Sequence, residues 1–284
     1  MSELIDFSKY RALREEQQRL VKANQAIVLV GIGASGERAL HYIQSSSDDG
    51  SGSAFYDPVP PGSVQPVAAA RYLADRRVAI ILGDFGTPFD LEQARVAVTY
   101  CRANGMLTVA VVTTPFLPAS PSAHEDRQKL LASVDMCVVV PWVNLADTTP
   151  AATPRNQLLL NTIELLTNPA LRNGPGRFTL EELQETIGGS GLAAVQMAYG
   201  GNVLEAIKNA TKALTREADI DAAAGAIIEI VTQESVSTSM QAVIGRFIEN
   251  TALHQLSPWA CFTIDPELRG GHSRATLLVT GLTA

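Results

Sequence analysis

The chain has 284 residues, of which 46% are hydrophobic and 18% charged, and its net charge is −7. This composition is typical of a globular protein long enough for two domains, and the acidic balance argues against nucleic acid or an anionic membrane as a partner. No apolar run reaches the ~20 residues that a transmembrane helix needs. Residues 1–25 lack the apolar segment of a signal peptide. We therefore expect a soluble, cytoplasmic protein.

The cysteines and histidines do not form a metal-binding pattern. Cys101, Cys137 and Cys261 lie far apart in apolar stretches, which is typical of reduced core residues and not of disulfides. None of the four histidines pairs with another histidine or with a cysteine at metal-ligand spacing. We expect no bound metal.

The first half of the chain alternates apolar strands with helices. Residues 1–24 are polar with a thin apolar stripe, which predicts a helix docked on the first domain or, alternatively, a helix for a partner or a membrane surface. Strands are predicted at 26–30, 78–82, 107–113 and 135–140, helices at 37–44, 87–104 and 124–132, and a surface loop at 45–62. Continuous apolar strands between helices indicate a parallel sheet covered on both faces. We assign this α/β domain to residues 25–150.

The pattern changes in the second half. A long helix at 153–167 and a turn at 168–176 form a central connection, assigned to residues 151–176. Further on, strands are predicted at 192–199, 224–232, 259–264 and 274–281, with helices at 203–214 and 239–253. This order predicts a smaller α+β domain with a mixed sheet over residues 177–284.

A glycine-rich turn links the first strand to the first helix. It reads Gly31-Ile-Gly33-Ala-Ser-Gly36, and glycines there let backbone N–H groups approach an anion at a helix N-terminus. The same spacing is the dinucleotide-binding fingerprint, which needs an acidic residue about 20 positions on, at the end of a second strand. That region is the loop Ser45–Gly52, with no strand predicted before it. A tight turn that binds nothing is a third interpretation.

Longer segments resemble FtsZ and the tubulins. Gly31–Ala39 resembles the first nucleotide loop of FtsZ, GxGGxGxNA, and Gly105–Phe116 nearly repeats the FtsZ segment GILTVAVVTKPF. Other segments follow the family in order and spacing, at 134–141, 164–169, 224–230, 262–266 and 275–281. The resemblance covers about residues 25–282. It implies the FtsZ/tubulin fold, with a parallel-sheet half like the nucleotide domain, a central helix and a smaller α+β half.

The second phosphate loop of the family, GGGTGTG, is not preserved. Counting back without gaps from Gly105 places it on Gly86–Glu92, which reads GTPFDLE. Pro88 has no N–H to donate, and Asp90 brings negative charge towards a polyanion. The same residues predict a capped helix, with Thr87 as the N-cap and Pro88 at the first helical position.

The remaining family motifs are also altered. The asparagine of the first loop is Arg38, which could bind an anion through its charge. The catalytic loop NxDxxD corresponds to Arg177–Glu182, where Glu182 is the retained acid and the candidate catalytic residue. Thr179 to Glu182 is also a capping box, which needs no catalytic role. The candidate nucleotide- or anion-binding residues are Gly31, Gly33, Ala34, Ser35, Gly36, Arg38, Gly86 and Thr87.

These observations together predict an FtsZ-like cytoskeletal or scaffold protein that associates with itself and has little or no GTPase activity. We expect no cofactor, although GTP or GDP remains the candidate ligand. Bacterial FtsZ-like proteins suggest cell division or membrane remodelling as the setting. The first alternative is a polymerising GTPase that binds nucleotide through unusual loops. The second is a dinucleotide-binding enzyme of the Rossmann type.

Overall fold

The computed structural model describes residues 26–47, 57–58, 73, 76–113, 125, 128–140, 153–171, 179–251, 253–256, 258–265, 268 and 272–282. The predicted N-terminal helix at 1–24 lies outside the described residues. The strands are β1 (Ile27–Gly31), β2 (Asp57–Pro58), β3 (Val78–Gly83), β4 (Leu107–Thr113), β5 (Met136–Val140), β6 (Gly191–Gly200), β7 (Gly225–Thr232), β8 (Trp259–Ile264) and β9 (Ser273–Leu282). The helices are α2 (Gly33–Ser47), α4 (Pro88–Ala103), α6 (Thr153–Leu171), α7 (Leu180–Ile187), α8 (Val203–Leu214) and α9 (Thr238–Glu249), with short 3-10 turns η1 (Ile220–Ala222) and η2 (His254–Leu256).

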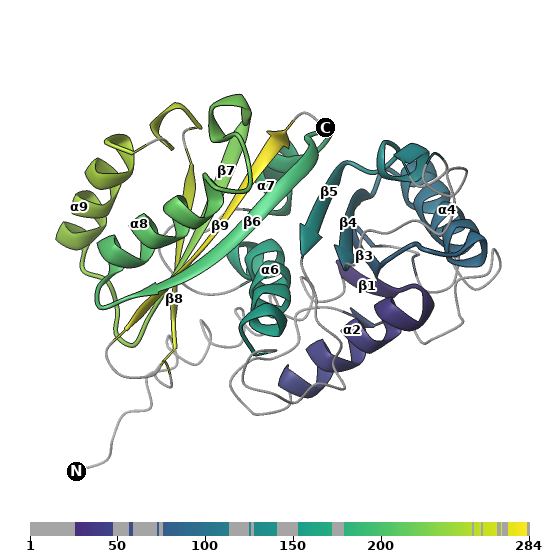
Figure 1. Cartoon of the computed structure of the whole chain (residues 1–284), viewed down its shortest axis with the longest axis horizontal. Helices are drawn as coiled ribbons and strands as arrows, with labels where there is room; N and C mark the ends of the chain where they lie inside the picture. Colours follow the sequence, from purple (N-terminus) through teal and green to yellow (C-terminus); the bar gives the residue numbers. More distant parts are fainter. Residues whose placement is uncertain are drawn as a thin grey trace, which may run out of the picture.

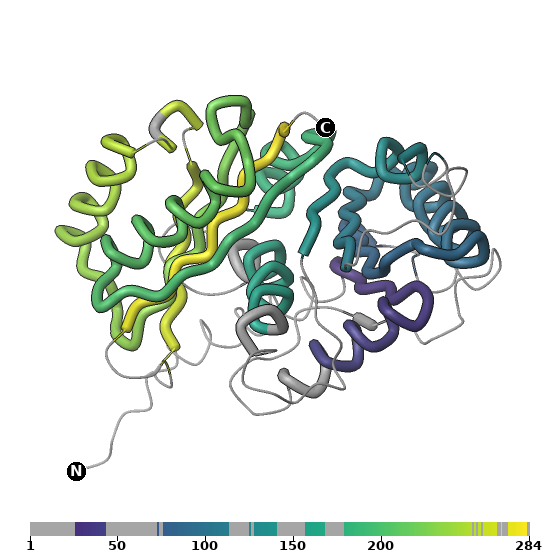
Figure 2. Tube along the Cα trace, in the orientation of Figure 1, coloured from purple at the N-terminus to yellow at the C-terminus, as the bar shows by residue number. Residues whose placement is uncertain are grey.

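All of these strands belong to one nine-stranded sheet in the order β2-β1-β3-β4-β5-β6-β9-β7-β8. The strands from β2 to β6 run parallel, β9 is antiparallel to both β6 and β7, and β8 is parallel to β7. Figure 1 shows the two halves side by side, with α6 between them, and Figure 2 traces the chain from the first half into the second. The halves are joined in the sheet by three residue pairs of β5 and β6, from Met136–Gly191 to Val138–Ala193.

The first half is a parallel sheet with helices on both faces, as predicted. Every residue of β1, β3 and β4 is buried, because these strands are continuous apolar runs between two helical layers. Helices α2, α6 and α7 share one core cluster with one face of the sheet, and α4 shares a second cluster with the other face.

Helix α6 belongs to a core that extends through both halves. Its residues Leu159 and Ile163 are in the same buried cluster as Val138 of β5 and Leu278 of β9. The Arg274 side chain of β9, itself buried, donates a hydrogen bond to the Glu164 carboxylate of α6 at 3.2 Å. Apolar packing and a charge pair therefore both connect α6 to the second half.

The second half has helices α8 and α9 on the face of its sheet opposite α6. Ala206, Ile207 and Ala210 of α8 and Ile244 of α9 are buried with Ile228 of β7 in a third core cluster. Figure 1 shows α8 lying over the sheet alongside β6, with α9 at the outer edge of this half. Within the part of the chain that the structure describes, no helix is both long and apolar enough to cross a bilayer.

The boundaries of three helices differ from the prediction. Helix α2 begins at Gly33 and not at residue 37, so the glycine turn is itself the first turn of the helix. Helix α6 continues to Leu171, into the predicted turn, and α9 ends at Glu249 and not at 253. Asn250 is the C-cap of α9, and its side-chain amide donates to the Arg246 carbonyl. Such a cap satisfies terminal carbonyls, which ends the helix early.

The predicted loop at 45–62 contains a strand that the sequence did not indicate. Asp57 and Pro58 form β2, which pairs with Val28 and Leu29 of β1. The prediction of a surface loop over the whole of 45–62 is therefore wrong at residues 57–58. A strand of two residues is too short to show a hydrophobic period, which is why it was missed.

We expect that Leu159→Ala will lower the free energy of unfolding by about 2–5 kcal/mol, because it opens a cavity where the side chain is fully buried. Urea unfolding followed by circular dichroism measures this change. Lys208→Ala on the exposed surface of α8 is the control, expected within about 0.5 kcal/mol of the wild type. A Leu159→Ala protein as stable as the control would contradict the central position of α6 in the core.

Candidate functional site

The turn between β1 and α2 is tightly bonded to the neighbouring strand. Ile32 is the one residue between the two elements, and its N–H donates to the Leu82 carbonyl of β3 at 2.8 Å. The Gly36 N–H donates to the Ile32 carbonyl at 3.2 Å. Gly33 has φ +66°, in the left-handed region that glycine adopts without the strain of a side chain.

Two of the three glycines are required by close packing. A Cβ atom at Gly31 would lie 2.7 Å from the Gly36 carbonyl oxygen. A Cβ atom at Gly36 would overlap the carbonyl oxygen of Leu82. The first turn of α2 therefore lies directly on the ends of β1 and β3. These glycines are explained by the fold, whether or not a ligand binds beside them.

The third glycine faces a carboxylate from another helix. A Cβ atom at Gly33 would lie 2.7 Å from both the carboxyl carbon and one oxygen of Asp90. Asp90 comes from the first turn of α4 and is 9% exposed. The N-terminus of a helix carries partial positive charge, which favours a negative group beside it. A carboxylate of the chain itself thus lies against the first residue of α2.

The other candidate residues of the first loop differ in burial. The Ser35 hydroxyl is buried and lies 2.7 Å from the Thr113 hydroxyl at the end of β4, so it has a partner inside the protein. Ala34 and Arg38 are exposed on α2. The structure therefore brings Gly31, Gly33 and Gly36 together with Ser35, and places Arg38 on the outer surface.

The second loop forms the helix cap that the sequence predicts. Thr87 is the N-cap of α4, its hydroxyl accepts a hydrogen bond from the Asp90 N–H at 3.1 Å, and Pro88 occupies the first helical position. The Gly86 N–H donates to an Asp84 carboxylate oxygen at 3.1 Å. The N–H groups of Gly86 and Asp90 are both used within the protein.

Phe85 holds this loop against the core. Its side chain is buried, and a Cβ atom at Gly83 would lie 2.9 Å from its ring. Phe85 also has φ +49°, which is uncommon for a bulky residue and persists when packing over-determines it. The sequence reasoning missed both Asp84 and Phe85. The spacing of Asp84 and Gly86 is typical of an Asx turn and was the available signal.

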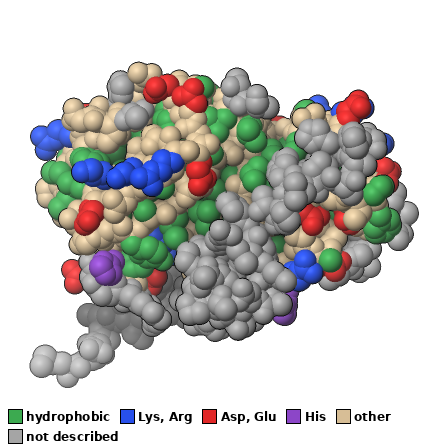
Figure 3. Space-filling view, in the orientation of Figure 1, with side chains coloured by type: hydrophobic (Ala, Val, Ile, Leu, Met, Phe, Trp, Pro, Cys, Tyr) green, Lys and Arg blue, Asp and Glu red, His purple; other side chains and the backbone are tan. Residues whose placement is uncertain are grey.

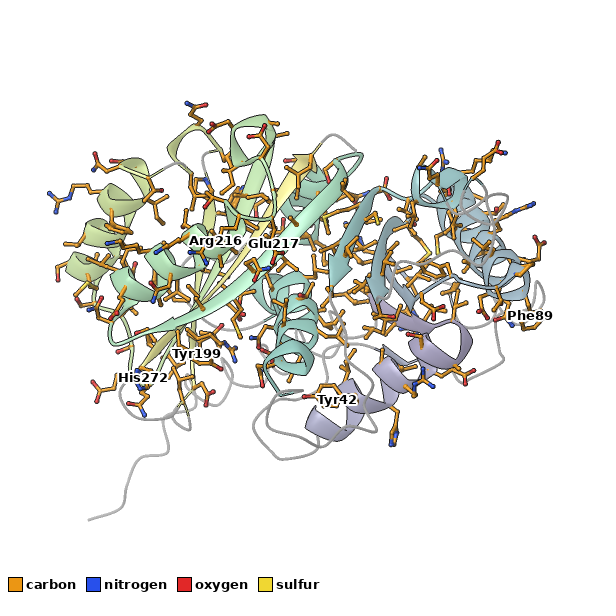
Figure 4. The ribbon with its side chains drawn as sticks, viewed as in Figure 1. Tyr42, Phe89, Tyr199, Arg216, Glu217 and His272 are labelled. Carbon is orange, nitrogen blue, oxygen red and sulfur yellow. The ribbon has the colours of Figure 1, made fainter. Side chains whose placement is uncertain are left out.

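A large apolar side chain lies exposed beside the two loops. Phe89, in the first turn of α4, is 70% exposed. Figure 4 places it at the outer end of α4, directed away from the sheet. Figure 3 shows apolar surface at this edge of the molecule with acidic side chains around it. The loop face therefore combines an exposed aromatic ring with negative charge.

Glu182 takes part in the capping box that the sequence predicts. Its carboxylate accepts a hydrogen bond from the Thr179 N–H at 2.6 Å, and its own N–H donates to the Thr179 hydroxyl at 3.2 Å. The neighbouring Glu181 forms an ion pair with Arg77 at 2.8 Å. A backbone hydrogen bond and then the Arg77 guanidinium hold the pKa of Glu181 below its ordinary value. The capping role of Glu182 is confirmed, and a catalytic role stays a prediction.

The cysteines are free and buried, as predicted. Burial raises the pKa of the Cys101 thiol to about 12, and burial followed by the nearby Glu229 raises that of Cys261 well above its ordinary value. These thiols stay protonated and behave as small apolar residues. Across the described ranges, no group of three or more His, Cys, Asp or Glu side chains is arranged to hold a metal ion.

Comparison of the sequence with known proteins finds relatives named FtsZ. No protein-family model matches the chain. It is 25% identical over 237 residues to the cell division protein FtsZ 1 of Methanocaldococcus jannaschii, covering 78% of this chain and 63% of that protein. It is 25% identical over 208 residues to FtsZ 1 of Pyrococcus horikoshii, covering 67% and 54%. The aligned part of the chain thus spans less than two thirds of the length of these relatives.

Solved structures agree with the sequence relatives. An empty FtsZ dimer from M. jannaschii matches with a TM-score of 0.72 at 20% identity, covering 99% of this chain and 93% of that one. The chain is thus similar in sequence to FtsZ and has the fold of the FtsZ/tubulin superfamily. GDP-form protofilaments of TubZ from Bacillus thuringiensis serovar israelensis match with a TM-score of 0.57 at 9% identity. The FtsZ/tubulin fold predicted from the resemblance is confirmed.

We expect Gly36→Ala to lower the free energy of unfolding of this protein by about 1–3 kcal/mol, because the new methyl group overlaps the Leu82 carbonyl and overpacks the turn. Gly245→Ala is the matched control. It lies in α9 with open space around it, and alanine there should raise the free energy of unfolding by about 0.5–1 kcal/mol through helix propensity. Thermal or urea unfolding compares the two. Equal stability of both variants would show that Gly36 is not held by packing.

Proposed function

We propose that the chain is an FtsZ-like cytoskeletal or scaffold protein that associates with itself without hydrolysing GTP. The observation that supports this best is the Asp90 carboxylate against Gly33 at the start of α2. A phosphate brought to the same helix end would meet a negative charge already there. Two unit charges about 4 Å apart interact by about 4 kcal/mol at the effective dielectric of a protein surface.

Part of the hydrogen-bonding capacity of the two loops is already used within the chain. A hydrogen bond contributes about 0.5–1.5 kcal/mol net, and the N–H groups of Ile32 and Gly36 already bond to carbonyls of the chain. The N–H groups of Gly86 and Asp90, in the second loop, are bonded as well. We infer that a nucleotide binds weakly or not at all at these two loops.

Relatives support the assembly part of the proposal. The sequence relatives are named as cell division proteins, and solved relatives are described as an FtsZ dimer and as TubZ protofilaments. Those properties belong to those proteins. For this chain we propose self-association in the cytoplasm, in cell division or membrane remodelling, with the partners still to be identified.

The main alternative is a nucleotide-binding, polymerising GTPase. It is favoured by the TubZ filaments, which were solved in GDP and GTPγS forms, and by the three glycines of the first loop. The dinucleotide-enzyme alternative is favoured by β2, because this strand pairs with β1 and supplies an acidic residue, Asp57, after the glycine-rich turn. The FtsZ likeness covers 99% of the chain, however, and includes the whole second half, so we prefer an FtsZ-like function.

We expect the purified protein to carry no nucleotide and to release no phosphate from GTP above background, because Asp90 disfavours phosphate at α2. Chromatography of the heat-denatured protein identifies any released base. Steady-state phosphate release at high protein concentration, beside an authentic FtsZ, measures turnover. Turnover within a few-fold of that FtsZ would establish the GTPase alternative.

We expect a dimer or short oligomer by light scattering whose size does not change with GTP or GDP. Among the described residues, Phe89 is the most exposed of the large hydrophobic side chains, and exposed aromatic residues are frequent anchors of interfaces. Phe89→Ser should therefore weaken self-association. Met240→Ser on α9, at the opposite end of the molecule in Figure 1, is the control for lost apolar surface and should not. A monomer that assembles only after GTP is added would contradict the proposal.

A further inference from the structure

Strand β8 forms one edge of the sheet. It is the last strand in the order of the sheet, and among the described strands only β7 pairs with it, over Trp259–Ile264. The edge of a sheet presents a row of backbone N–H and C=O groups that have no partner within that sheet. Such an edge is a position where a further extended strand can be added.

The structure shows which residues of β8 direct their backbone groups outward. The Asp265 N–H, directly after the strand, donates to the Thr232 carbonyl of β7 at 2.8 Å, so the backbone of Asp265 points toward β7. Successive residues of a strand direct these groups to opposite sides. Ala260, Phe262 and Ile264 therefore point their N–H and C=O groups to the outer side. Within the described ranges, no other segment of the chain forms a backbone hydrogen bond with these three residues.

The strand lacks the features by which edge strands commonly avoid pairing. Its sequence is Trp-Ala-Cys-Phe-Thr-Ile, with no charged residue and no proline. Its register with β7 is continuous, so no bulge turns the edge away. Lysine, proline and bulges are the usual means of blocking an edge. Ile264 is also 53% exposed, which adds a large apolar side chain to this edge.

We propose that β8 pairs antiparallel with β8 of a second copy of this chain, around a two-fold axis at Phe262. The proposal rests on the self-association part of the proposed function and names a surface and a partner for it. The contact joins two copies through their second halves. It is separate from the contact expected at Phe89, which lies on α4 in the first half.

The outward residues determine the register. In an antiparallel pair, opposed residues whose backbone groups face each other exchange two hydrogen bonds. An axis at Phe262 opposes Phe262 to its own copy and Ala260 to Ile264 of the second copy, so every outward residue is bonded. An axis at Cys261 opposes Ala260 to Phe262 and places Ile264 opposite residue 258, outside the strand. The axis at Phe262 therefore uses the edge completely.

Side chains and charge favour a second copy as the occupant. Ala260 and Phe262 pack on the face of the sheet that α8 and α9 cover, and Ile264 follows them on that face by alternation. In the two-fold pair the small Ala260 lies beside the large Ile264, and the two Phe262 rings meet. Asp265 lies beside Trp259 of the second copy and not beside another carboxylate. A contact between identical surfaces must be self-complementary in this way.

Cysteine cross-linking tests the partner, the orientation and the register together. Ala260, Phe262 and Ile264 are each replaced by cysteine in the full chain, and circular dichroism checks folding. The proteins, singly and as a mixture of Ala260→Cys with Ile264→Cys, are oxidised in air with copper phenanthroline. Covalent dimers are followed over time on non-reducing gels. The wild type is the background control, because its own cysteines are free and buried.

We expect Phe262→Cys to form a covalent dimer at least about tenfold faster than Ala260→Cys or Ile264→Cys alone, because only position 262 opposes itself. Opposed Cα atoms lie about 5.5 Å apart, which a disulfide bridges, whereas Ala260 lies roughly 14 Å along the strand from its own copy. The mixture should cross-link faster than either of its components. If Phe262→Cys does not fold, the mixture decides.

Three results would overturn the proposal. Equal rates in all samples would show random collision, which does not depend on register. Fast self-linking of Ala260→Cys would show a parallel pair. A failure of every sample to exceed the wild type would show that this edge does not meet a second copy. Failure of the proposed function is distinguishable, because it is measured as GTP turnover or GTP-dependent assembly of the wild type, without any cysteine variant.

Discussion

The burial of α6 is the constraint on which the rest of the structure depends. Leu159 and Ile163 pack against strands of both halves, so neither half completes its core without this helix. A fully buried leucine contributes about 1.5–3 kcal/mol through the hydrophobic effect, and several residues of α6 share this position. The buried Arg274 also needs its carboxylate partner on α6, Glu164. The orientation of α6 therefore follows from packing and charge together.

The glycine loop shows how a sequence motif can persist for reasons other than a ligand. Gly31 and Gly36 are required where α2 meets the strands, and Gly33 leaves room for Asp90. A family likeness in these residues is therefore weak evidence for nucleotide binding. The second loop adds to this, because Phe85 is buried beneath it and Thr87 caps the helix that follows. Both loops are explained by contacts within the chain.

Local signals predicted the elements, and contacts distant in sequence escaped prediction. Strand β4 and helix α8 have the predicted bounds, since an apolar run and a helical period are visible within each segment. The caps at Thr87 and Thr179 were likewise found, because a cap involves residues three positions apart. The Asp90–Gly33 contact and the Ser35–Thr113 hydrogen bond were not. They depend on how separate helices and strands pack in space, and no local sequence pattern predicts this packing.

The join between β5 and β6 has a mechanical consequence. Three residue pairs of β5 and β6, together with the core around α6, carry part of the load that passes from one half to the other. Backbone hydrogen bonds between neighbouring strands resist force together when the strands are pulled along their length, and break one after another when they are pulled apart sideways. If subunits assemble into a filament, the direction of this short ladder relative to the filament axis decides how much tension a subunit bears before its halves separate.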